Sequence, residues 1–302
     1  MTRLLRLARI HFLVASLTLF IAGAVWAILL GAPFSLVRLL FGYLIVLPAH
    51  LSVSFSNDYF DVEVDRLGKP TLFTGGSGIL VNYPGLRRPA RLIAIILIGI
   101  SWIIGLSFMV VYAYSVWFLA YVILCSLLGW FYSAPPLRLA YRGLGELSTA
   151  LTGGCLVPMM GYLVIKGGLS TEGFLFTIPL IFYGLAFILT VEIPDLEIDR
   201  QGKKYTWVTH IGRKKGFYLI MYMLLVAVGI FYFFQRLYSR SSPVDSRFLA
   251  LFSLLPLGAA IFASIKKPIE TKIATRHVNS ILIGLALFFI LMDGYLITLS
   301  IH

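Results

Sequence analysis

Charged residues are scarce in this chain of 302 residues, since only 13% are Asp, Glu, Lys or Arg, against about 25% in soluble domains. Hydrophobic residues make up 59%, above the usual level of about 45–50%. A soluble globular protein is excluded by this composition. Because one crossing of a membrane takes about 20 apolar residues, the apolar content corresponds to roughly nine helices and leaves no room for a separate soluble domain.

Cysteine and acidic residues are also scarce. The two cysteines, Cys125 and Cys155, lie inside apolar runs, which excludes a disulfide framework. The chain has 13 acidic and 25 basic residues, which gives a net charge of +12. Nucleic-acid-binding proteins carry such an excess as basic stripes on a solvated domain, and this chain has no such domain. We therefore expect no nucleic-acid partner and interpret the charge as a signal of membrane topology.

The apolar runs, divided at Gly, Pro and charge clusters, predict an all-α membrane protein with a bundle of nine transmembrane helices. Strands are excluded because the runs are long, lack period-two alternation, and could not satisfy an open sheet edge in lipid. The whole chain, 1–302, is expected to form a single integral membrane domain. The predicted spans are 10–30, 36–56, 90–112, 115–133, 144–165, 172–194, 216–235, 246–265 and 277–300.

The basic residues predict the orientation of these spans. If the N-terminus is cytoplasmic, 20 of the 25 Lys and Arg residues fall on the cytoplasmic side. Such a bias is the positive-inside signal. The chain is therefore predicted to be a multi-pass protein with its N-terminus in the cytoplasm, and with the acidic segments described next on the same side.

Eight of the 13 acidic residues lie in two short windows, after the second and sixth predicted spans. The windows repeat at an offset of 134 residues: DVEVDRLGK from Asp61 to Lys69 aligns with DLEIDRQGK from Asp195 to Lys203. Asp58 aligns with Glu192, so all four acids match. Four helices separate the copies, and an even number returns the chain to the same membrane face. The pattern predicts a parallel internal repeat.

Within each window two aspartates lie four residues apart and share a helical face, Asp61 with Asp65 and Asp195 with Asp199. Asn57 extends the first face by one turn. Like charges at this spacing repel each other, so a compensating cation is expected. Magnesium suits the site because it prefers oxygen ligands and joins one or two carboxylates to substrate phosphates. Two such pairs facing each other would hold a diphosphate through Mg²⁺.

Two other interpretations of the windows stay open. The acids could be solvated loop charges balanced by neighbouring basic residues, namely Arg66, Lys69, Arg200 and Lys203. They could also form the ion site of a cation-coupled transporter, which would place them near the middle of the membrane. Repetition of four acids in register argues against the first interpretation, and their place at cytoplasmic helix ends argues against the second.

The segments NDYFDVEVD and PDLEID, on the second and sixth of nine predicted helices, resemble the UbiA superfamily of intramembrane prenyltransferases, and the resemblance covers almost the whole chain. The first family pattern, N-x3-D-x3-D, is matched by Asn57, Asp61 and Asp65, and the second, D-x3-D, by Asp195 and Asp199. The connection from Tyr132 to Arg138 resembles the family's Pro-rich basic loop. Glu192 departs from the pattern, since many relatives carry an amide near that position.

The resemblance implies a Mg²⁺-dependent transferase that moves an isoprenyl group from an isoprenyl diphosphate donor to a small acceptor. The allylic diphosphate would ionise with Mg²⁺ on its leaving group, and the ring of Tyr132 would face the developing cation. Asp61, Asp65, Asp195 and Asp199 would be the metal ligands, and with Asn57 and Tyr132 the catalytic set. The diphosphate contacts would be Asn57, Lys69, Arg138 and Lys203.

The acceptor is indicated by one further segment. Thr71 to Leu80 resembles the Gly-Gly-Ser-Gly stretch of menaquinone-type naphthoate prenyltransferases, which favours an aromatic quinone precursor. The alternative acceptor is geranylgeranylglyceryl phosphate in ether-lipid synthesis, whose branch carries a basic, Pro-rich segment there; Lys69-Pro70 is the only such hint. Membrane lipids are the expected surroundings, and the sequence identifies neither the donor chain length nor the oligomeric state.

Overall fold

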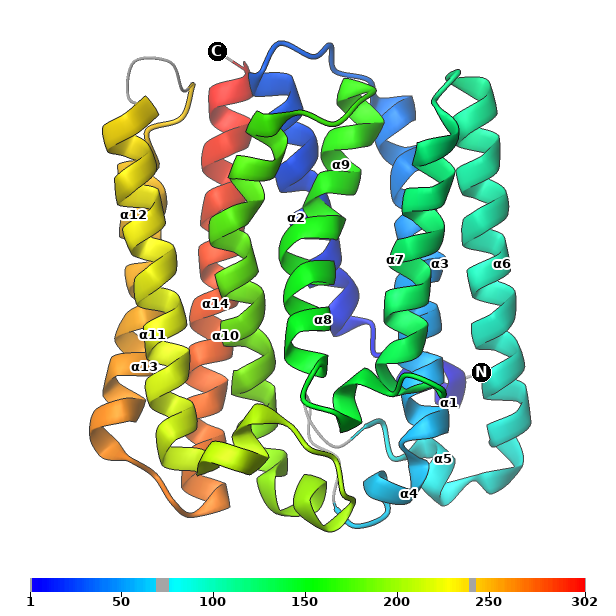
Figure 1. Cartoon of the computed structure of the whole chain (residues 1–302), viewed down its shortest axis with the longest axis vertical. Coiled ribbons are helices and arrows are strands. Elements are labelled where there is room, and N and C mark those ends of the chain that lie inside the picture. The colour runs from blue at the N-terminus through cyan, green and yellow to red at the C-terminus, as the bar shows by residue number, and fades with distance from the viewer. Residues whose placement is uncertain (1, 69–75, 239–242, 302) are drawn as a thin grey trace. The chain divides into compact units, whose positions relative to one another are not determined.

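The computed structural model describes residues 2–68, 76–238 and 243–301, and all regular elements in these ranges are helices (Figure 1). Within these ranges nine helical segments are long and apolar enough to cross a membrane, which confirms the predicted all-α bundle. They are Phe12–Leu29, Leu36–Phe60, Pro84–Val111, Val116–Ser133, Gly145–Lys166, Thr171–Gln201, Trp207–Leu237, Ser246–Lys266 and Thr271–Ile301.

Two helices extend well beyond the apolar runs that predicted them. Helix α10 (Thr171–Gln201) continues through the second acidic window, so acids expected to follow the helix lie on its last turns. Helix α11 (Trp207–Tyr238) begins nine residues before the predicted start and bends at Gly212, where φ is 79°. Apolar runs mark the hydrocarbon layer, whereas helical hydrogen bonding continues into the polar region on either side.

Contacts divide the chain into two compact units. The first unit comprises residues 2–17, 36–148 and 197–206. Helices α3 (Leu36–Phe60), α6 (Arg87–Val111) and α7 (Val116–Ser133) lie side by side in it (Figure 1). Between α6 and α3, the Ser101 hydroxyl donates a hydrogen bond of 2.8 Å to the carbonyl of Ile45. The short helices of this unit are α1 (Thr2–Leu7), α4 (Val62–Asp65), α5 (Ile79–Asn82) and the 3₁₀ turns Pro84–Leu86 and Leu139–Tyr141.

The second unit comprises residues 18–35, 149–196 and 207–301. It contains most of α2 (His11–Leu29) and of α10, together with α9 (Val157–Lys166), α11, α12 (Ser246–Phe252), α13 (Leu254–Lys266) and α14 (Thr271–Ile301). Helix α8 (Gly145–Leu151) and the last five residues of α10 cross into the first unit. Gly23 of α2 faces the carbonyl of Pro158, and Gly161 of α9 faces that of Phe20, so a Cβ at either glycine would overlap backbone. Small residues thus allow backbone contact between helices, as is common in membranes.

Candidate active site

Asp61 stands where α3 ends, and the chain bends there (φ −94°, ψ 3°) before entering α4. Both of its carboxylate oxygens accept hydrogen bonds from the α7–α8 connection. The Ser133 hydroxyl donates to Oδ2 at 3.1 Å, and the Tyr141 hydroxyl donates to Oδ1 at 2.9 Å. Asp61 is itself buried. A buried carboxylate is stable only when paired and hydrogen-bonded, and these donors supply the bonds.

Lys204 supplies the opposite charge. Its Nζ lies 3.5 Å from Asp61 Oδ2, and its side chain is 17% exposed. Burial by itself lowers the pKa of this ammonium, but the Asp199 and Asp61 carboxylates raise the pKa well above its usual value. Lys204 is therefore a permanent cation between the first acidic window and Asp199, the last acid of the second.

The end of α10 explains why Lys204 points this way. Lys203 adopts the left-handed conformation (φ 54°). The Lys204 N–H donates to the Asp199 carbonyl at 2.8 Å, and the Lys203 N–H donates to the Arg200 carbonyl at 3.2 Å. These two bonds are the Schellman pattern that closes a helix C-terminus. The closure leaves Lys203 exposed and turns Lys204 inward.

The two acidic windows touch through reciprocal glycine contacts. A Cβ at Gly68 would overlap Ile198 Cδ1, and a Cβ at Gly202 would lie 2.7 Å from Val64 Cγ1. Gly68 and Gly202 are 134 residues apart, as are Val64 and Ile198. Each window thus presents a glycine to the branched side chain of the other. Because glycine has no side chain, the segments carrying Asp61 and Asp199 can approach each other closely.

Asp65 is half-buried beside the other acids of its window. Burial, then repulsion from Asp61 and Asp58, raises its pKa to about 8, against the opposing influence of Lys204 and Arg9. One turn before Asp61, the buried side-chain oxygen Oδ1 of Asn57 has no hydrogen-bond partner. A bound cation would lower the raised pKa of Asp65, because it favours the ionised carboxylate, and it could bind the Asn57 oxygen that has no partner.

Tyr132 lies at the end of α7, and Arg138 lies in the connection that follows it. The Arg138 guanidinium sits over the Tyr141 ring, with its carbon 3.9 Å from the ring centroid. Tyr132 packs against Gly145, whose added Cβ would lie 3.3 Å from Tyr132 Cε2. Burial, followed by the negative charge of Asp61, raises the pKa of the Tyr141 hydroxyl. That hydroxyl therefore stays protonated and donates to Asp61.

The sequence also matches the model of a known protein family. The family model for the UbiA prenyltransferase family matches residues 16–276. The chain belongs to this family. Its place in the UbiA family confirms the resemblance that the two acidic windows carry.

Two characterised UbiA-type relatives align with part of the chain. It is 26% identical over 179 residues to 1,4-dihydroxy-2-naphthoate octaprenyltransferase of Bacillus subtilis, covering 59% of this chain and 56% of the relative. It is 25% identical over 211 residues to homogentisate phytyltransferase of Synechocystis, covering 64% of this chain and 65% of the relative. The aligned regions thus span a little more than half to about two thirds of these relatives.

Solved structures share the UbiA fold along nearly the whole chain. A UbiA homologue from Archaeoglobus fulgidus, bound to GPP and Mg²⁺, superposes with a TM-score of 0.65 at 15% identity, covering 96% of this chain and 99% of that one. A digeranylgeranylglyceryl phosphate synthase superposes with a TM-score of 0.68 at 16% identity, covering 98% of each chain. At such identities the likeness concerns the fold alone.

The sequence-predicted residues of this UbiA-family chain fall into separate places. Asn57, Asp61, Asp65, Tyr132, Arg138, Asp199 and Lys203 lie in the first unit. Asp195 lies in the second unit, one turn before Asp199 on the same helix. Lys69, and the segment from Thr71 to Gly75, lie outside the described residues. Among the acids, Glu63 and Glu197 are exposed, and Glu63 forms ordinary surface ion pairs with Arg66 and Arg87 at 2.7 and 3.5 Å.

The oxygen set fits a magnesium ion that is shared with a substrate. In the described part of the chain, no three His, Cys, Asp or Glu side chains converge closely enough to hold a metal by themselves. Mg²⁺ does not need three, because it keeps several waters and takes phosphate oxygens as further ligands. The partnerless Asn57 oxygen and the Asp61 and Asp65 carboxylates are ligands of the kind it prefers.

Sequence reasoning missed three contacts of Asp61: Ser133, Tyr141 and Lys204. Ser133 belongs to the segment from Tyr132 to Arg138 that the sequence analysis singled out, and Tyr141 lies three residues beyond it, so their neighbourhood carried a signal. Lys204 follows the repeat-related Lys203, whose predicted contact with the diphosphate stays a prediction; the lysine that pairs with Asp61 is Lys204. Only the left-handed turn at Lys203 distinguishes the two lysines.

Proposed function

We propose that this chain is a Mg²⁺-dependent intramembrane prenyltransferase that moves an isoprenyl group from an isoprenyl diphosphate to a ring carbon of an aromatic quinone precursor. The observation that carries the proposal is Asp61, buried and held by Ser133, Tyr141 and Lys204, beside the segment that bears Asp199. A carboxylate held this way has one orientation, which a metal and diphosphate site requires.

Asn57, Asp61, Asp65 and Asp199, all in the first unit, are the residues that would hold the metal, and Asp195 stays a prediction from the sequence. When bound, Mg²⁺ supplies charge neutralisation for the diphosphate leaving group. The chain's own cations add to this: Arg138 and Lys204 lie 3.9 and 6.0 Å from the centroid of the Tyr141 ring. We propose Lys204, in place of the exposed Lys203, as the lysine of this window that contacts the diphosphate.

Bond breaking in the donor leaves the electron pair with the diphosphate and a positive charge on the allylic carbons. An electron-rich ring carbon of the acceptor then forms the new C–C bond and afterwards releases its proton. The aromatic faces of Tyr132 and Tyr141 are the groups proposed to stabilise the cation. Burial in the membrane keeps water, a competing nucleophile, away from that cation.

An aromatic acceptor is favoured by two independent lines of support. Gly76-Ser77-Gly78 belongs to the stretch that resembles menaquinone-type prenyltransferases, and both partially aligned relatives act on aromatic acceptors by name. The synthase with a similar fold supports the alternative, transfer to the oxygen of geranylgeranylglyceryl phosphate. That acceptor brings a second phosphate, which needs basic contacts beyond Lys204 and Arg138.

The deciding experiment is a transfer assay in detergent or vesicles with a labelled isoprenyl diphosphate and a panel of acceptors. We expect a Mg²⁺-dependent, C-prenylated product with dihydroxynaphthoate or hydroxybenzoate, identified by mass spectrometry, and weak or absent transfer to geranylgeranylglyceryl phosphate. The reverse preference would reassign the acceptor. Absence of any prenylated product, together with ion-gradient-driven flux, would favour the transporter instead.

A further inference from the structure

Asp58, the first acid of the first window, is bonded within the protein. It is 2% exposed, and its carboxylate accepts hydrogen bonds from the backbone N–H of Ser77 at 3.1 Å and from the Ser77 hydroxyl. Ser77 Oγ also accepts from the Ile79 N–H at 3.2 Å. The segment Gly76–Asn82 is therefore tied to the end of α3 by a compact polar latch of Asp58 and Ser77.

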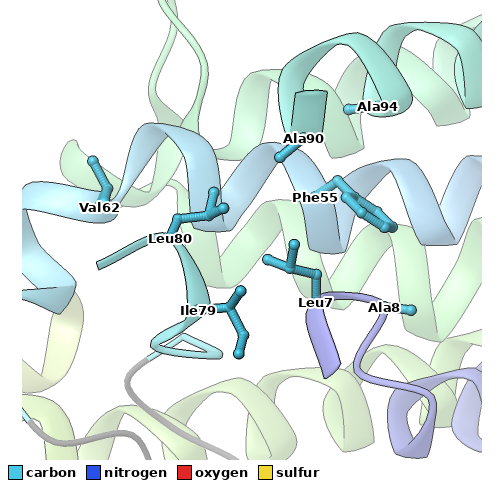
Figure 2. Close-up of a cluster of buried hydrophobic side chains, with 8 residues drawn as sticks. All are labelled: Leu7, Ala8, Phe55, Val62, Ile79, Leu80, Ala90 and Ala94. Atoms are coloured by element: carbon cyan, nitrogen blue, oxygen red, sulfur yellow. The ribbon is translucent and has the colours of Figure 1, made fainter. Parts of the chain in front are cut away.

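An apolar cluster holds the same segment from the other side. Ile79 and Leu80, directly after the latch, are buried with Leu7 of α1, Phe55 of α3 and Val62 of α4 (Figure 2). The Asn82 side chain closes the turn by donating to the Gly78 carbonyl at 2.9 Å. Gly76–Asn82 is thus docked by both polar and apolar contacts onto the helix that carries the first acidic window.

The docked segment reaches Asp65. Gly76 is in the left-handed region (φ 62°), and a Cβ added there would overlap the Asp65 carboxylate, with Oδ2 as the nearest atom. The backbone of Gly76 therefore forms one wall against this carboxylate. Only glycine satisfies both conditions, since it tolerates the positive φ and leaves room for the carboxylate.

We propose that Asp58 is a positioning residue and not a metal ligand: it holds Ser77 so that Gly76 fixes the carboxylate of Asp65 in the donor site. Asp58 is 2% exposed and both of its oxygens face the Ser77 N–H, whereas Asp65 is only half-buried, with its carboxylate against Gly76. This assignment rests on the proposed function, because it gives a role to a residue of the same site.

The assignment separates two substitutions of one residue. Asp58→Asn keeps an oxygen that can accept from Ser77, whereas Asp58→Ala removes the acceptor. We expect Asp58→Asn to retain kcat/KM within about threefold and the Mg²⁺ requirement of the parent protein. Asp58→Ala and Ser77→Ala should each lower kcat/KM about 10-fold and raise the Mg²⁺ concentration for half-maximal rate, as loss of an outer partner of a ligand does.

The double variant Asp58→Ala/Ser77→Ala should be no worse than the poorer single variant, since both changes break one latch. Ser101→Ala is the matched control, because it removes another buried serine hydrogen bond in the same unit; it should lower thermal stability without changing the Mg²⁺ requirement. Losses in Asp58→Asn as large as those in Asp61→Asn, or additive losses in the double variant, would overturn the proposal.

A readout without catalysis keeps the test independent of the proposed function. In the full-length protein, hydrogen exchange of a peptide covering 76–82 should speed up about 10-fold in Asp58→Ala and stay near the parent rate in Asp58→Asn. A peptide from α12 should not change in either variant. Unchanged exchange in Asp58→Ala would overturn the latch, and if Asp58→Ala does not fold, Ser77→Ala provides the same measurement. Failure of every acceptor would instead refute the proposed transfer while this exchange result stood.

Discussion

The two acidic windows carry nearly the same residues but follow different backbone paths. The first bends at Asp61 (φ −94°, ψ 3°) and continues as the short helix α4. The second stays helical to Gln201 and closes on Lys203 in the left-handed region (φ 54°). The same spacing of aspartates is therefore compatible with two different helix ends, and the second end sends Lys204 to Asp61.

The segments that follow the windows differ as well. Each contains a left-handed glycine, Gly78 (φ 68°) and Gly212 (φ 79°), again 134 residues apart. Beside Gly78, Ser77 binds the Asp58 carboxylate. After Gly212, the Arg213 Nε donates to the Ile193 carbonyl at 3.1 Å. The first contact uses a side-chain acceptor and the second a backbone carbonyl, and Ser77 aligns with Ile211 and not with Arg213, so the two aligned glycines lie beside contacts of different kinds.

The largest possible difference between the windows is the side of the membrane on which they lie. Arg66→Cys and Arg200→Cys, both exposed and repeat-related, should react with an impermeant maleimide from the cytoplasmic side in a background lacking Cys125 and Cys155. Ser115→Cys should react only from the opposite side. Labelling of positions 66 and 200 from opposite faces of the membrane would show that the two windows cannot form one site.

The next largest effect is expected from the carboxylates. Asp61→Asn and Asp199→Asn should each reduce prenyl transfer by roughly 10²–10³-fold, the cost typical of removing one electrostatic stabiliser, because each window supplies ligands that the other cannot replace. Steady-state assays measure the loss. The matched controls are the exposed acids of the same windows, Glu63→Gln and Glu197→Gln, which should stay close to the parent rate. A fully active Asp199 variant would show that the first window suffices.

Lysine substitutions sharpen the comparison at the helix ends. Lys204→Gln should lower kcat/KM about 10–100-fold, because it removes the cation that partners Asp61. Lys203→Gln, at an exposed position, should cost less than about threefold, as exposed charges generally contribute little. Steady-state measurements of kcat/KM for the two variants show which lysine contributes more. A greater loss at Lys203 would return the diphosphate contact to the residue that the repeat predicts.

The reciprocal glycines test whether the windows must be in contact. Gly202→Ala places a methyl group 2.7 Å from Val64 Cγ1, and overpacking of this kind costs about 1–3 kcal/mol. We expect lower thermal stability and severalfold weaker Mg²⁺ activation, both restored by adding Val64→Ala. Gly85→Ala, with open space around its Cβ, is the control. If Gly202→Ala matches this control, close contact between the windows is not needed.

The last expected effect is on pH dependence, and it concerns the first window. The pKa of Asp65 is raised to about 8 from about 4 in unfolded chains. Its contribution to the stability of the metal-free protein is therefore full below about pH 4 and is lost as the pH rises through about 8. Mg²⁺ needs the ionised form, so binding below pH 8 should release close to one proton and weaken about 10-fold per pH unit on acidification. Calorimetry in buffers of different ionisation enthalpy measures the release, which should vanish in Asp65→Asn.

Much of the architecture was predictable because it follows from local composition. Each apolar run is long enough to cross a membrane by itself, so nine spans can be counted without tertiary contacts. The errors lie at the helix ends. Helix α10 continues past its apolar run, because a helix ends where its backbone hydrogen bonds stop and not where its hydrophobic residues stop. Helix α11 has an additional short helical stretch before the bend at Gly212. The aspartates were found because Mg²⁺ chemistry demands carboxylates at a short, repeated spacing.

The contacts of those aspartates were not predictable in the same way. Ser133 and Tyr141 reach Asp61 across 72 and 80 residues of chain, and no local pattern carries such a distance. Neighbouring residues on a helix point about 100° apart, so the choice between Lys203 and Lys204 depends on how one turn closes. Likewise, Asp58 is in the sequence only one of four aligned acids, and its contact with Ser77 is a tertiary one.

The sequence by itself determined that this protein lies in a membrane, how many spans it has, and that it carries UbiA-type acidic windows with oxygen ligands. These properties depend on residue type and on spacing within a few helical turns. Only the tertiary structure decided which acid is buried under donors, which lysine partners it, and which glycines bring the segments of Asp61 and Asp199 together. Those choices depend on contacts between segments far apart in the chain, where the direction of a single side chain changes its role.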